Sequence, residues 1–286
     1  MKYKNIFIFE KKNILLFLCF CIIYLYQFSI KNKNISIIDS GKKTNYETFE
    51  VDKFKEIKNK LEQTKCSQMW ENQKEFLNGI IRKFKPKKVL ELGVAAGGSS
   101  IILNAMNDFD NSKLYSIDLY AHNLVGFCVN KYFPQLTKKW TLFKGNIATE
   151  FIETIGKNID IALIDTAHFE PGEIMDFLII LPFLKEEAIV IFHDIANQIT
   201  RSNKRNEWAP YIIFNAIRGE KYLPSGKYIL KQDIGAVKLE KNQKKYYHDY
   251  FRLLGGQWQY FPKETHTFIK KSKIIIKNKL LNKIFK

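Results

Sequence analysis

Arginine is scarce in this chain, although the chain is strongly basic. Only five of its 46 basic residues are Arg, Lys supplies the other 41, and the net charge is +17. Surfaces that read nucleic-acid bases favour Arg, because its planar guanidinium forms paired hydrogen bonds. Lys is over-used together with Asn, Ile, Phe and Tyr, as an AT-rich coding sequence would produce. We therefore expect a solvated, Lys-rich surface and no nucleic-acid partner.

Cysteine is also scarce, and its spacing indicates neither a zinc site nor a disulfide framework. The four cysteines are Cys19, Cys21, Cys66 and Cys128, and none belongs to a C-x-x-C pair. Structural zinc sites and disulfide-rich domains both depend on closely spaced cysteines. We therefore expect a reducing compartment.

Charge is absent from the eighteen residues 13–30, "NILLFLCFCIIYLYQFSI". As a helix this run is about 27 Å long, just enough to span a bilayer core. Lys residues flank it on both sides, so they indicate no orientation, and no small-residue cleavage site of a signal peptide follows. We expect a membrane anchor that leaves the rest of the chain in the cytoplasm; the alternative is a buried or peripheral helix.

The remaining sequence predicts an α/β fold with N-terminal helices. Apolar residues at helical spacing predict helices over 54–63 and 69–84, and Pro86 then ends the second helix. Short apolar runs alternate with helical patterns after Pro86, which is typical of a doubly wound, mostly parallel sheet, here seven-stranded. The predicted parallel strands are 88–92, 113–117, 140–144, 159–164 and 188–192, and an antiparallel hairpin over 226–230 and 234–239 closes the sheet. The predicted segments are 1–39, a helical 40–85, a ligand-binding domain over 86–240, and an aromatic, Lys-rich tail over 241–286.

A glycine-rich turn follows the first predicted strand in "VLELGVAAGGSS". Gly93, Gly97 and Gly98 allow backbone N–H groups to approach a ligand at the carboxyl end of the sheet. A dinucleotide fingerprint needs Gly at 93, 95 and 98, and position 95 is Ala. Glu91 would repel a pyrophosphate but suits a ligand that carries an ammonium group and no phosphate. S-adenosylmethionine is such a ligand.

Polar residues also end the second and third strands. Asp118 is placed to accept hydrogen bonds from ribose hydroxyls, although it is also suited to cap the following helix. Asn146 is placed to contact the adenine, and a helix cap explains it equally well.

These motifs together resemble the class I S-adenosylmethionine-dependent methyltransferases. The resemblance rests on E-x-G-x-x-x-G-G after the first strand, an acid after the second, "IDIALIDTAHFEPG" at the fourth, and the closing hairpin. "LIDTAHFEPGEIMDF" followed by "LKEEAIVIFHDI" resembles the D-x-x-H-x-[YF]-E … H-D pattern of a small-molecule and sugar O-methyltransferase group. That group includes relatives of cephalosporin hydroxylase and macrocin O-methyltransferase. The resemblance covers roughly residues 86–240.

The ends of the fourth and fifth strands predict the chemistry. Asp165 and Asp194 should converge beside the methyl donor, and two carboxylates suit Mg²⁺ or Mn²⁺. Ile195 departs from the catechol type, which offers an amide ligand there. His168 and His193 are candidate general bases; the alternatives are a helix-entry cap for His168 and a satisfied buried ring for His193. The predicted donor-binding residues are Glu91, Gly93, Gly97, Gly98, Asp118, Asn146 and Asp165.

The resemblance implies transfer of a methyl group to a hydroxyl of a small molecule or a sugar or glycan precursor. Two other classes stay open at this point. One is a nicotinamide-dependent oxidoreductase that uses the G-x-A-x-x-G variant, and the other is a membrane-tethered, non-catalytic binding protein. The sequence gives no oligomeric state.

Overall fold

A computed structural model of the chain describes residues 44–47, 54–64, 66–67, 69–196, 208–224 and 233–256. Contacts divide the chain into Met1–Asp39 and Ser40–Lys286, and all described residues belong to the second unit. The predicted membrane helix over 13–30 and the tail beyond 256 lie outside the described residues. Within the described residues, no helix is both long and apolar enough to cross a membrane.

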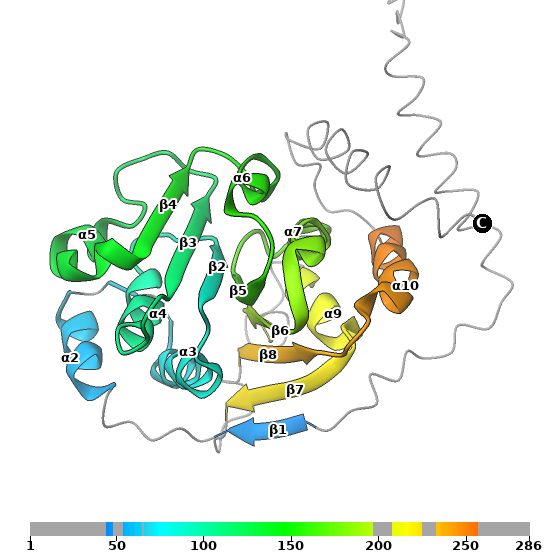
Figure 1. Cartoon of the computed structure of the whole chain (residues 1–286), viewed down its shortest axis with the longest axis horizontal. Coiled ribbons are helices and arrows are strands. Elements are labelled where there is room, and N and C mark those ends of the chain that lie inside the picture. The colour runs from blue at the N-terminus through cyan, green and yellow to red at the C-terminus, as the bar shows by residue number, and fades with distance from the viewer. Residues whose placement is uncertain are drawn as a thin grey trace, which may run out of the picture. The chain divides into compact units, whose positions relative to one another are not determined.

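An eight-stranded sheet forms the centre of the described fold (Figure 1). Its strands lie in the order β1-β7-β8-β6-β5-β2-β3-β4, and among them β8 runs antiparallel to its neighbours β6 and β7. The chain order reverses between β2 and β5, which makes this position the topological switch point, where ligands bind in such sheets. The strands are β1 (Thr44–Glu47), β2 (Lys88–Leu92), β3 (Lys113–Asp118), β4 (Trp140–Lys144), β5 (Ile159–Ile164), β6 (Leu184–His193), β7 (Gly219–Pro224) and β8 (Ile234–Leu239).

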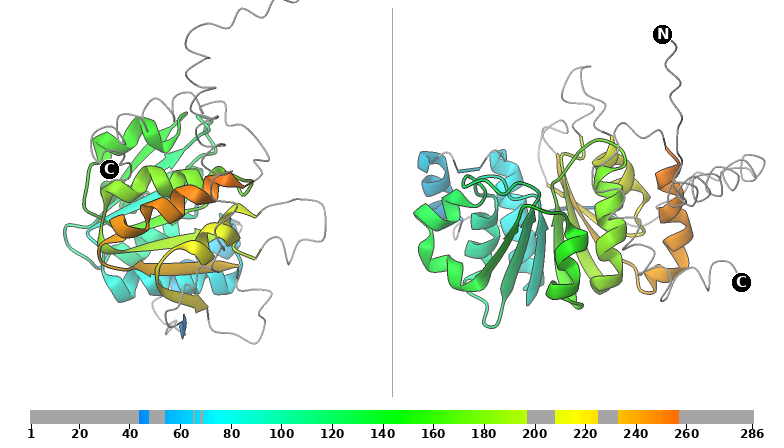
Figure 2. Two further views of the ribbon diagram at one scale, coloured as in Figure 1. Left: turned by 90° about the vertical axis from the view of Figure 1, so that its right-hand side faces the viewer. Right: turned by 90° about the horizontal axis from the view of Figure 1, so that it is seen from above.

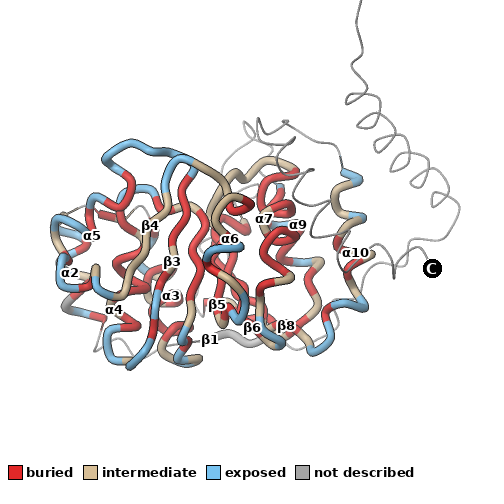
Figure 3. Tube along the Cα trace, turned by 45° about the horizontal axis from the view of Figure 1, so that its top comes forward, coloured by how far each residue is buried: buried red, intermediate tan, exposed pale blue. Residues whose placement is uncertain are grey.

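Helices cover both faces of the sheet (Figure 2). Buried residues of the strands and helices, coloured red in Figure 3, form two apolar layers. Alternate strand residues point to opposite faces, so Val89 packs in one apolar layer and Leu90 in the other. Helices α2 to α5 contribute to the layer of Val89, and α6, α7, α9 and α10 contribute to the layer of Leu90. The helices are α2 (Lys55–Thr64), α3 (Glu71–Phe84), α4 (Ser99–Met106), α5 (Phe127–Tyr132), α6 (Ala148–Ile155), α7 (Gly172–Ile180), α9 (Ala209–Ala216) and α10 (Tyr247–Arg252). Short 3-10 segments are η1 (Pro134–Lys139), η2 (Leu181–Phe183), η4 (Gln243–Tyr246) and η5 (Leu253–Gly255).

The predicted parallel strands and N-terminal helices are confirmed. Strands β2, β4 and β5 have the predicted bounds, β3 extends one residue further, and β6 begins four residues earlier, at Leu184. Helix α3 ends where Lys85 adopts the left-handed conformation (φ 44°), directly before Pro86. Proline stops the helix there because it lacks an N–H and restricts the residue before it.

The closing hairpin is confirmed, but its first strand differs from the prediction. Strand β7, and not residues 226–230, pairs with β8, from Gly219 opposite Leu239 to Tyr222 opposite Ala236. Residues 226–230 lie outside the described part of the chain. Two similar apolar runs precede β8, and local pattern cannot tell which of them pairs across the sheet.

Strand β1 is an eighth strand that the sequence did not predict. Residues 40–85 were expected to be helical, yet Thr44–Glu47 pairs in parallel with β7 at the edge of the sheet. The segment "TNYE" has no apolar run, so its strand conformation depends on hydrogen bonds to β7 rather than on its own pattern.

One disulfide contradicts the expectation drawn from the cysteines. Cys66 and Cys128 are bonded to each other, although they are 62 positions apart in the sequence. Their spacing carries no local signal, because the fold brings the segment before α3 against the start of α5. The argument for a reducing compartment therefore loses its basis. Cys19 and Cys21 lie outside the described residues.

Candidate active site

The predicted site residues lie along one edge of the sheet. Gly93, Asp118, Asp165 and Asp194 stand at the carboxyl ends of β2, β3, β5 and β6, which are neighbouring strands. Parallel pairing aligns these ends, because Leu92 is opposite both Ile117 and Ile164, and Ile164 is opposite Phe192. The sheet thus brings together residues that are up to about a hundred positions apart in the sequence.

The glycine-rich turn packs so tightly that two of its glycines are required. Gly93 has φ 84°, and a Cβ there would lie 1.8 Å from the carbonyl oxygen of Asp165. A Cβ at Gly97 would lie 2.5 Å from Cβ of Cys128. A Cβ at Gly98 would have no neighbour closer than 3.8 Å. Gly93 and Gly97 are therefore needed by the fold itself, whereas the space at Gly98 is open.

Substitution should distinguish Gly97, which the packing of the fold requires, from Gly98, where the space is open. Gly97→Ala is expected to lower the free energy of unfolding by about 1–3 kcal/mol, since its Cβ overlaps the side chain of Cys128. Gly98→Ala, the matched control one residue away, should change it by less than about 0.5 kcal/mol. Urea denaturation of the two variants measures this, and equal losses would contradict the assignment.

Asp118 holds the turn through backbone hydrogen bonds. Its Oδ2 accepts the N–H groups of Val94 (2.9 Å) and Ala95 (3.1 Å), and its Oδ1 accepts the N–H of Tyr120 (2.8 Å). Ala95 adopts φ 47°, in the left-handed region where the dinucleotide fingerprint has its second glycine. A carboxylate has about four acceptor positions, so Asp118 retains capacity for a ribose hydroxyl. Contact with a ribose stays a prediction.

Glu91 is buried inside a polar network. Its Oε2 accepts hydrogen bonds from the hydroxyls of Ser99 and Ser116, both at 2.5 Å, and the indole of Trp140 donates to Ser116 at 2.8 Å. Burial raises the pKa of Glu91 to about 7, against the lowering effect of the two serine hydroxyls. The network joins β2, α4, β3 and β4 behind the turn. The predicted contact of Glu91 with a ligand ammonium is not tested by this geometry.

Asn146 makes a local contact. Its Oδ1 accepts the N–H of Ile147 at 2.9 Å, directly before α6. Ile147 itself stands at the N-cap of α6, and no side chain caps this end of the helix. The contact therefore decides neither interpretation of Asn146, and contact with an adenine stays a prediction.

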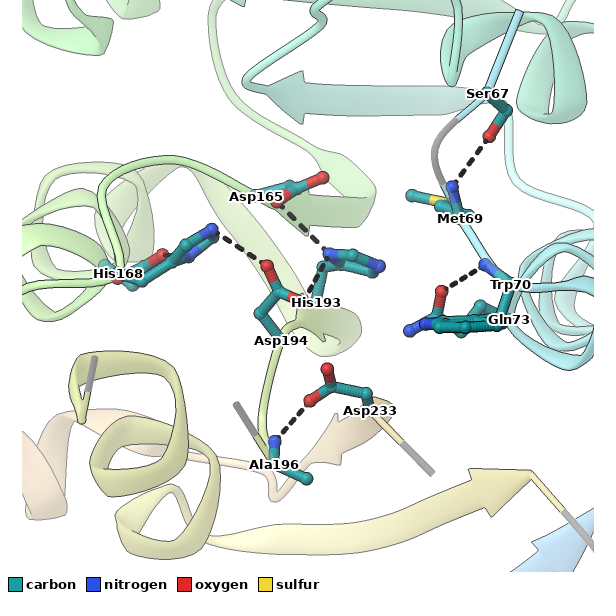
Figure 4. A network of polar contacts seen from close by, with 11 residues as sticks. Ser67, Met69, Trp70, Gln73, Asp165, His168, His193, Asp194, Ala196 and Asp233 are labelled. Atoms are coloured by element: carbon teal, nitrogen blue, oxygen red, sulfur yellow. Dashed lines mark hydrogen bonds and ion pairs between the residues drawn. The ribbon is translucent and has the colours of Figure 1, made fainter. Parts of the chain in front are cut away.

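Two histidines and three carboxylates form a continuous chain of contacts at the ends of β5 and β6 (Figure 4). His168 lies between Glu173 (Nδ1 to Oε1, 2.8 Å) and Asp194 (Nε2 to Oδ2, 2.9 Å). His193 directs Nδ1 toward Oδ1 of Asp165 (3.3 Å) and Oδ1 of Asp194 (3.4 Å). The predicted pairs Asp165/Asp194 and His168/His193 are therefore brought into one cluster. Glu173 is a member that the sequence analysis missed, although it follows His168 in "HFEPGE".

Asp194 has an unusual backbone that directs its carboxylate into the cluster. Its φ is 56°, immediately after β6, which is rare outside glycine although Asp and Asn tolerate it. Backbone strain of this kind gathers at functional sites.

Opposite charges dominate the titration of the cluster. Burial lowers the pKa of His168, but hydrogen bonds to Asp194 and Glu173 outweigh it and raise the pKa to about 11. His193 is raised in the same way, by Asp165 and Asp194, to a pKa of about 10. Both rings hold the pKa of Asp194 well below its usual range despite burial. Without a cation, the two rings are thus held as imidazolium at neutral pH.

The donor atoms of Asp165, His168 and Asp194 suit a divalent cation. One ligand atom from each residue lies within 4.8 Å of the other two. Buried Glu173 orients the ring of His168 through Nδ1, as carboxylates commonly do for metal-binding histidines. An imidazole ligand shifts the preference from Mg²⁺ toward Mn²⁺, Fe²⁺ or Zn²⁺. The sequence analysis predicted Asp165 and Asp194 as metal ligands and both histidines as candidate bases. In the structure His168 is also a possible ligand, whereas His193 is not a member of the group.

Two further polar residues near the cluster were missed by the sequence analysis. Asp233, directly before β8, accepts the N–H of Ala196, and burial and the nearby Asp194 carboxylate raise its pKa to about 7. Gln73 of α3 accepts the N–H of Trp70 at 2.6 Å (Figure 4). The sequence placed Asp233 in a hairpin turn and Gln73 in a helix. Neither position by itself indicates a residue near the cluster.

Comparison with known proteins found a matching family model and solved structures with a similar fold. Residues 90–195 match the family model described as a methyltransferase domain. Cofactor-bound Rv0187 from MTB has a TM-score of 0.50 and 14% identity, over 66% of this chain and 90% of that chain. The O-methyltransferase TomG from Streptomyces achromogenes, in complex with SAM, has a TM-score of 0.48 and 12% identity, over 67% and 91% of the two chains. The O-methyltransferase from Bacillus cereus, in complex with SAH, has a TM-score of 0.48 and 12% identity, over 73% of this chain and 95% of that chain.

Among curated proteins, none matches the sequence significantly. At 14% identity the likeness to the MTB protein establishes the fold alone. The predicted doubly wound fold with an antiparallel closing hairpin is confirmed.

Proposed function

We propose that this chain, whose residues 90–195 match the family model of a methyltransferase domain, is a class I S-adenosylmethionine-dependent enzyme that transfers a methyl group to a hydroxyl oxygen. The proposal rests mainly on one observation. The Gly93–Gly98 turn, held by Asp118, and the Asp165–His168–Asp194 cluster lie along the same edge of the sheet. The first part suits the methyl donor and the second part suits the acceptor. The acceptor is a small molecule or a sugar or glycan precursor.

The donor would occupy the turn after β2. The open space at Gly98 would admit its amino-acid portion, and Asp118 has remaining capacity for the ribose hydroxyls. Asn146 would lie toward the adenine. Glu91 accepts hydrogen bonds from Ser99 and Ser116 and thereby supports the turn. Glu91 would therefore favour binding of the donor in two ways, by its charge near the donor ammonium and by its support of the turn.

The acceptor hydroxyl would lie beside the cluster. A divalent cation held by Asp165, His168 and Asp194 would lower the pKa of the hydroxyl and orient it. His193, which contacts both aspartates, is placed to accept the proton. Most of the acceleration would come from alignment of oxygen, methyl carbon and sulfur, because the reaction is an in-line displacement.

The start of α9 supports an acceptor that contains a ring. The N–H of Ala209 donates to the carbonyl oxygen of His168 at 3.2 Å, so this end of the helix adjoins the cluster. Trp208 and Tyr211 are 41% and 39% exposed there, with ring centroids 6.0 Å apart. Exposed aromatic rings offer flat apolar surfaces for a sugar or an aromatic acceptor.

The nicotinamide alternative has less support, because the matched family is a methyltransferase domain. Intact Asp118, Asp165 and Asp194 oppose a non-catalytic binding protein. We propose a cytoplasmic catalytic domain, where the donor is made, with membrane association through residues 13–30 as a further part of the proposal. The segment boundaries at 85 and 240 are proposals as well.

Calorimetric titration tests the donor site. We expect S-adenosylhomocysteine to bind with micromolar affinity, on the order of −8 kcal/mol, and NADH not to bind. Asp118→Ala should weaken binding by about 10–100-fold, because it removes a charged acceptor and releases the N–H groups of Val94 and Ala95. Asp118→Asn keeps the side-chain shape and one acceptor oxygen, so its affinity for S-adenosylhomocysteine should fall less than that of Asp118→Ala. Binding of NADH in place of S-adenosylhomocysteine would overturn the proposal.

A further inference from the structure

The Cys66–Cys128 disulfide joins two segments on either side of the glycine-rich turn. Cys66 lies between α2 and α3, and Cys128 lies in the first turn of α5. Both are buried, at 1% and 4% exposure. The bond therefore ties the N-terminal helical segment to the sheet domain at the proposed donor site.

The disulfide packs directly against the turn. A Cβ on Gly97 would lie 2.5 Å from Cβ of Cys128, 3.3 Å from its Sγ and 2.8 Å from the carbonyl oxygen of Cys66. A side chain at Gly97 would thus overlap Cys128 and the backbone of Cys66, so the turn has no spare room on this side.

Further contacts hold the neighbouring turn residues. The N–H of Cys128 donates to the carbonyl of Ala96 at 2.9 Å, and the N–H of Gly126 donates to the carbonyl of Ala95 at 2.8 Å. On the other segment, Cε of Met69 lies 3.9 Å from the position of a Cβ on Gly98. The start of α5 therefore holds Ala95 and Ala96 by hydrogen bonds, and the segment of Cys66 and Met69 lies near Gly97 and Gly98.

Reduction of the disulfide would disturb this packing. Two electrons and two protons from a dithiol reductant convert the disulfide into two thiols, and the dithiol becomes a disulfide. Non-bonded sulfur atoms keep van der Waals separation, so the two thiols need more room than the bonded pair. Because close-packed interiors transmit such displacements, either the segment at Cys66 or α5 must move, and Gly97 packs close to both.

We propose that the Cys66–Cys128 disulfide is a redox-sensitive clamp on the donor-binding turn. When it is bonded, residues 95–98 are held in the conformation that binds the donor, and when it is reduced, donor affinity falls. The clamp rests on the proposed function, since it acts on donor binding. It acts as a positioning device and does not take part in methyl transfer.

Titration of the full chain with S-adenosylhomocysteine tests the clamp. The oxidised protein is compared with protein reduced by dithiothreitol, well below the melting temperature of the reduced form, with circular dichroism as the check of folding. We expect the Kd to rise at least tenfold on reduction and to recover after reoxidation with glutathione disulfide. In turnover assays, the KM for the donor should rise while kcat at saturating donor changes little.

Two double variants serve as matched controls. Cys66→Ala/Cys128→Ala should bind weakly and no longer respond to dithiothreitol. Cys19→Ser/Cys21→Ser, which changes the other two cysteines, should respond as the unmodified chain does. Where the reduced chain does not stay folded, the alanine variant supplies the comparison.

The outcomes distinguish the clamp from the proposed function. An unchanged Kd in folded reduced protein overturns the clamp, even where the melting temperature falls, because that combination reflects stability alone. Failure of the oxidised protein to bind S-adenosylhomocysteine would instead count against the methyltransferase function.

Discussion

Removal of divalent cations should abolish methyl transfer and leave binding of S-adenosylhomocysteine largely unchanged. The expected separation follows from the structure, because the turn and Asp118 lie after β2 and β3, whereas Asp165, His168 and Asp194 lie after β5 and β6. Chelator-treated protein is assayed for turnover and, in parallel, titrated with S-adenosylhomocysteine. Addition of Mn²⁺ or Mg²⁺ should restore turnover, and the imidazole of His168 predicts that Mn²⁺ is the better of the two.

Asp194→Asn should act like chelation. Asparagine tolerates the left-handed backbone at this position (φ 56°) and keeps the side-chain shape, so the change removes ligand charge with little strain. Glu173→Gln, which weakens the hold on Nδ1 of His168, should raise the cation concentration needed for half-maximal activity. Full activity in excess chelator would contradict the metal assignment.

Substitution of the two histidines should lower kcat in different ways. His193→Ala removes the proposed base and should lower kcat by about 10²–10⁴-fold. This loss should shrink as pH rises, because the substrate hydroxyl then ionises unaided. His168→Ala should resemble partial chelation, with activity that excess Mn²⁺ recovers in part. Rate profiles against pH at several Mn²⁺ concentrations separate the two effects.

The direction of the pKa shift gives a check on this assignment. Asp165 and Asp194 raise the pKa of His193 to about 10, so in cation-free protein the ring keeps its proton at neutral pH and cannot accept another. A cation between these aspartates offsets their charge and should lower that pKa. NMR titration of His193 with and without Mg²⁺ measures the change. Normal turnover by both histidine variants would leave the base unassigned and remove this part of the proposal.

The sequence by itself determined the frame of the site. Short, largely apolar runs such as "IDIALI", set between helical patterns, predict strands covered on both faces, and their length favoured strands over helices for β5 and its parallel neighbours. Parallel strands align their carboxyl ends, and therefore Asp118, Asp165 and Asp194, each at a strand end, were predictably gathered along one edge. Gly93 was predictable for a similar reason, because the chain must turn sharply where β2 ends.

Only the tertiary structure decided how these residues are partnered. Glu173 pairs with His168 through a turn at the start of α7, and Ser99 and Ser116 reach Glu91 from two different elements. Cys66 and Cys128 meet across 62 residues, and β7 rather than residues 226–230 pairs with β8. Local pattern specifies which face of an element is apolar, because that depends on neighbours within a few residues. Which polar atoms meet depends on how distant elements pack, and the local periodicity of the sequence contains no information about that packing.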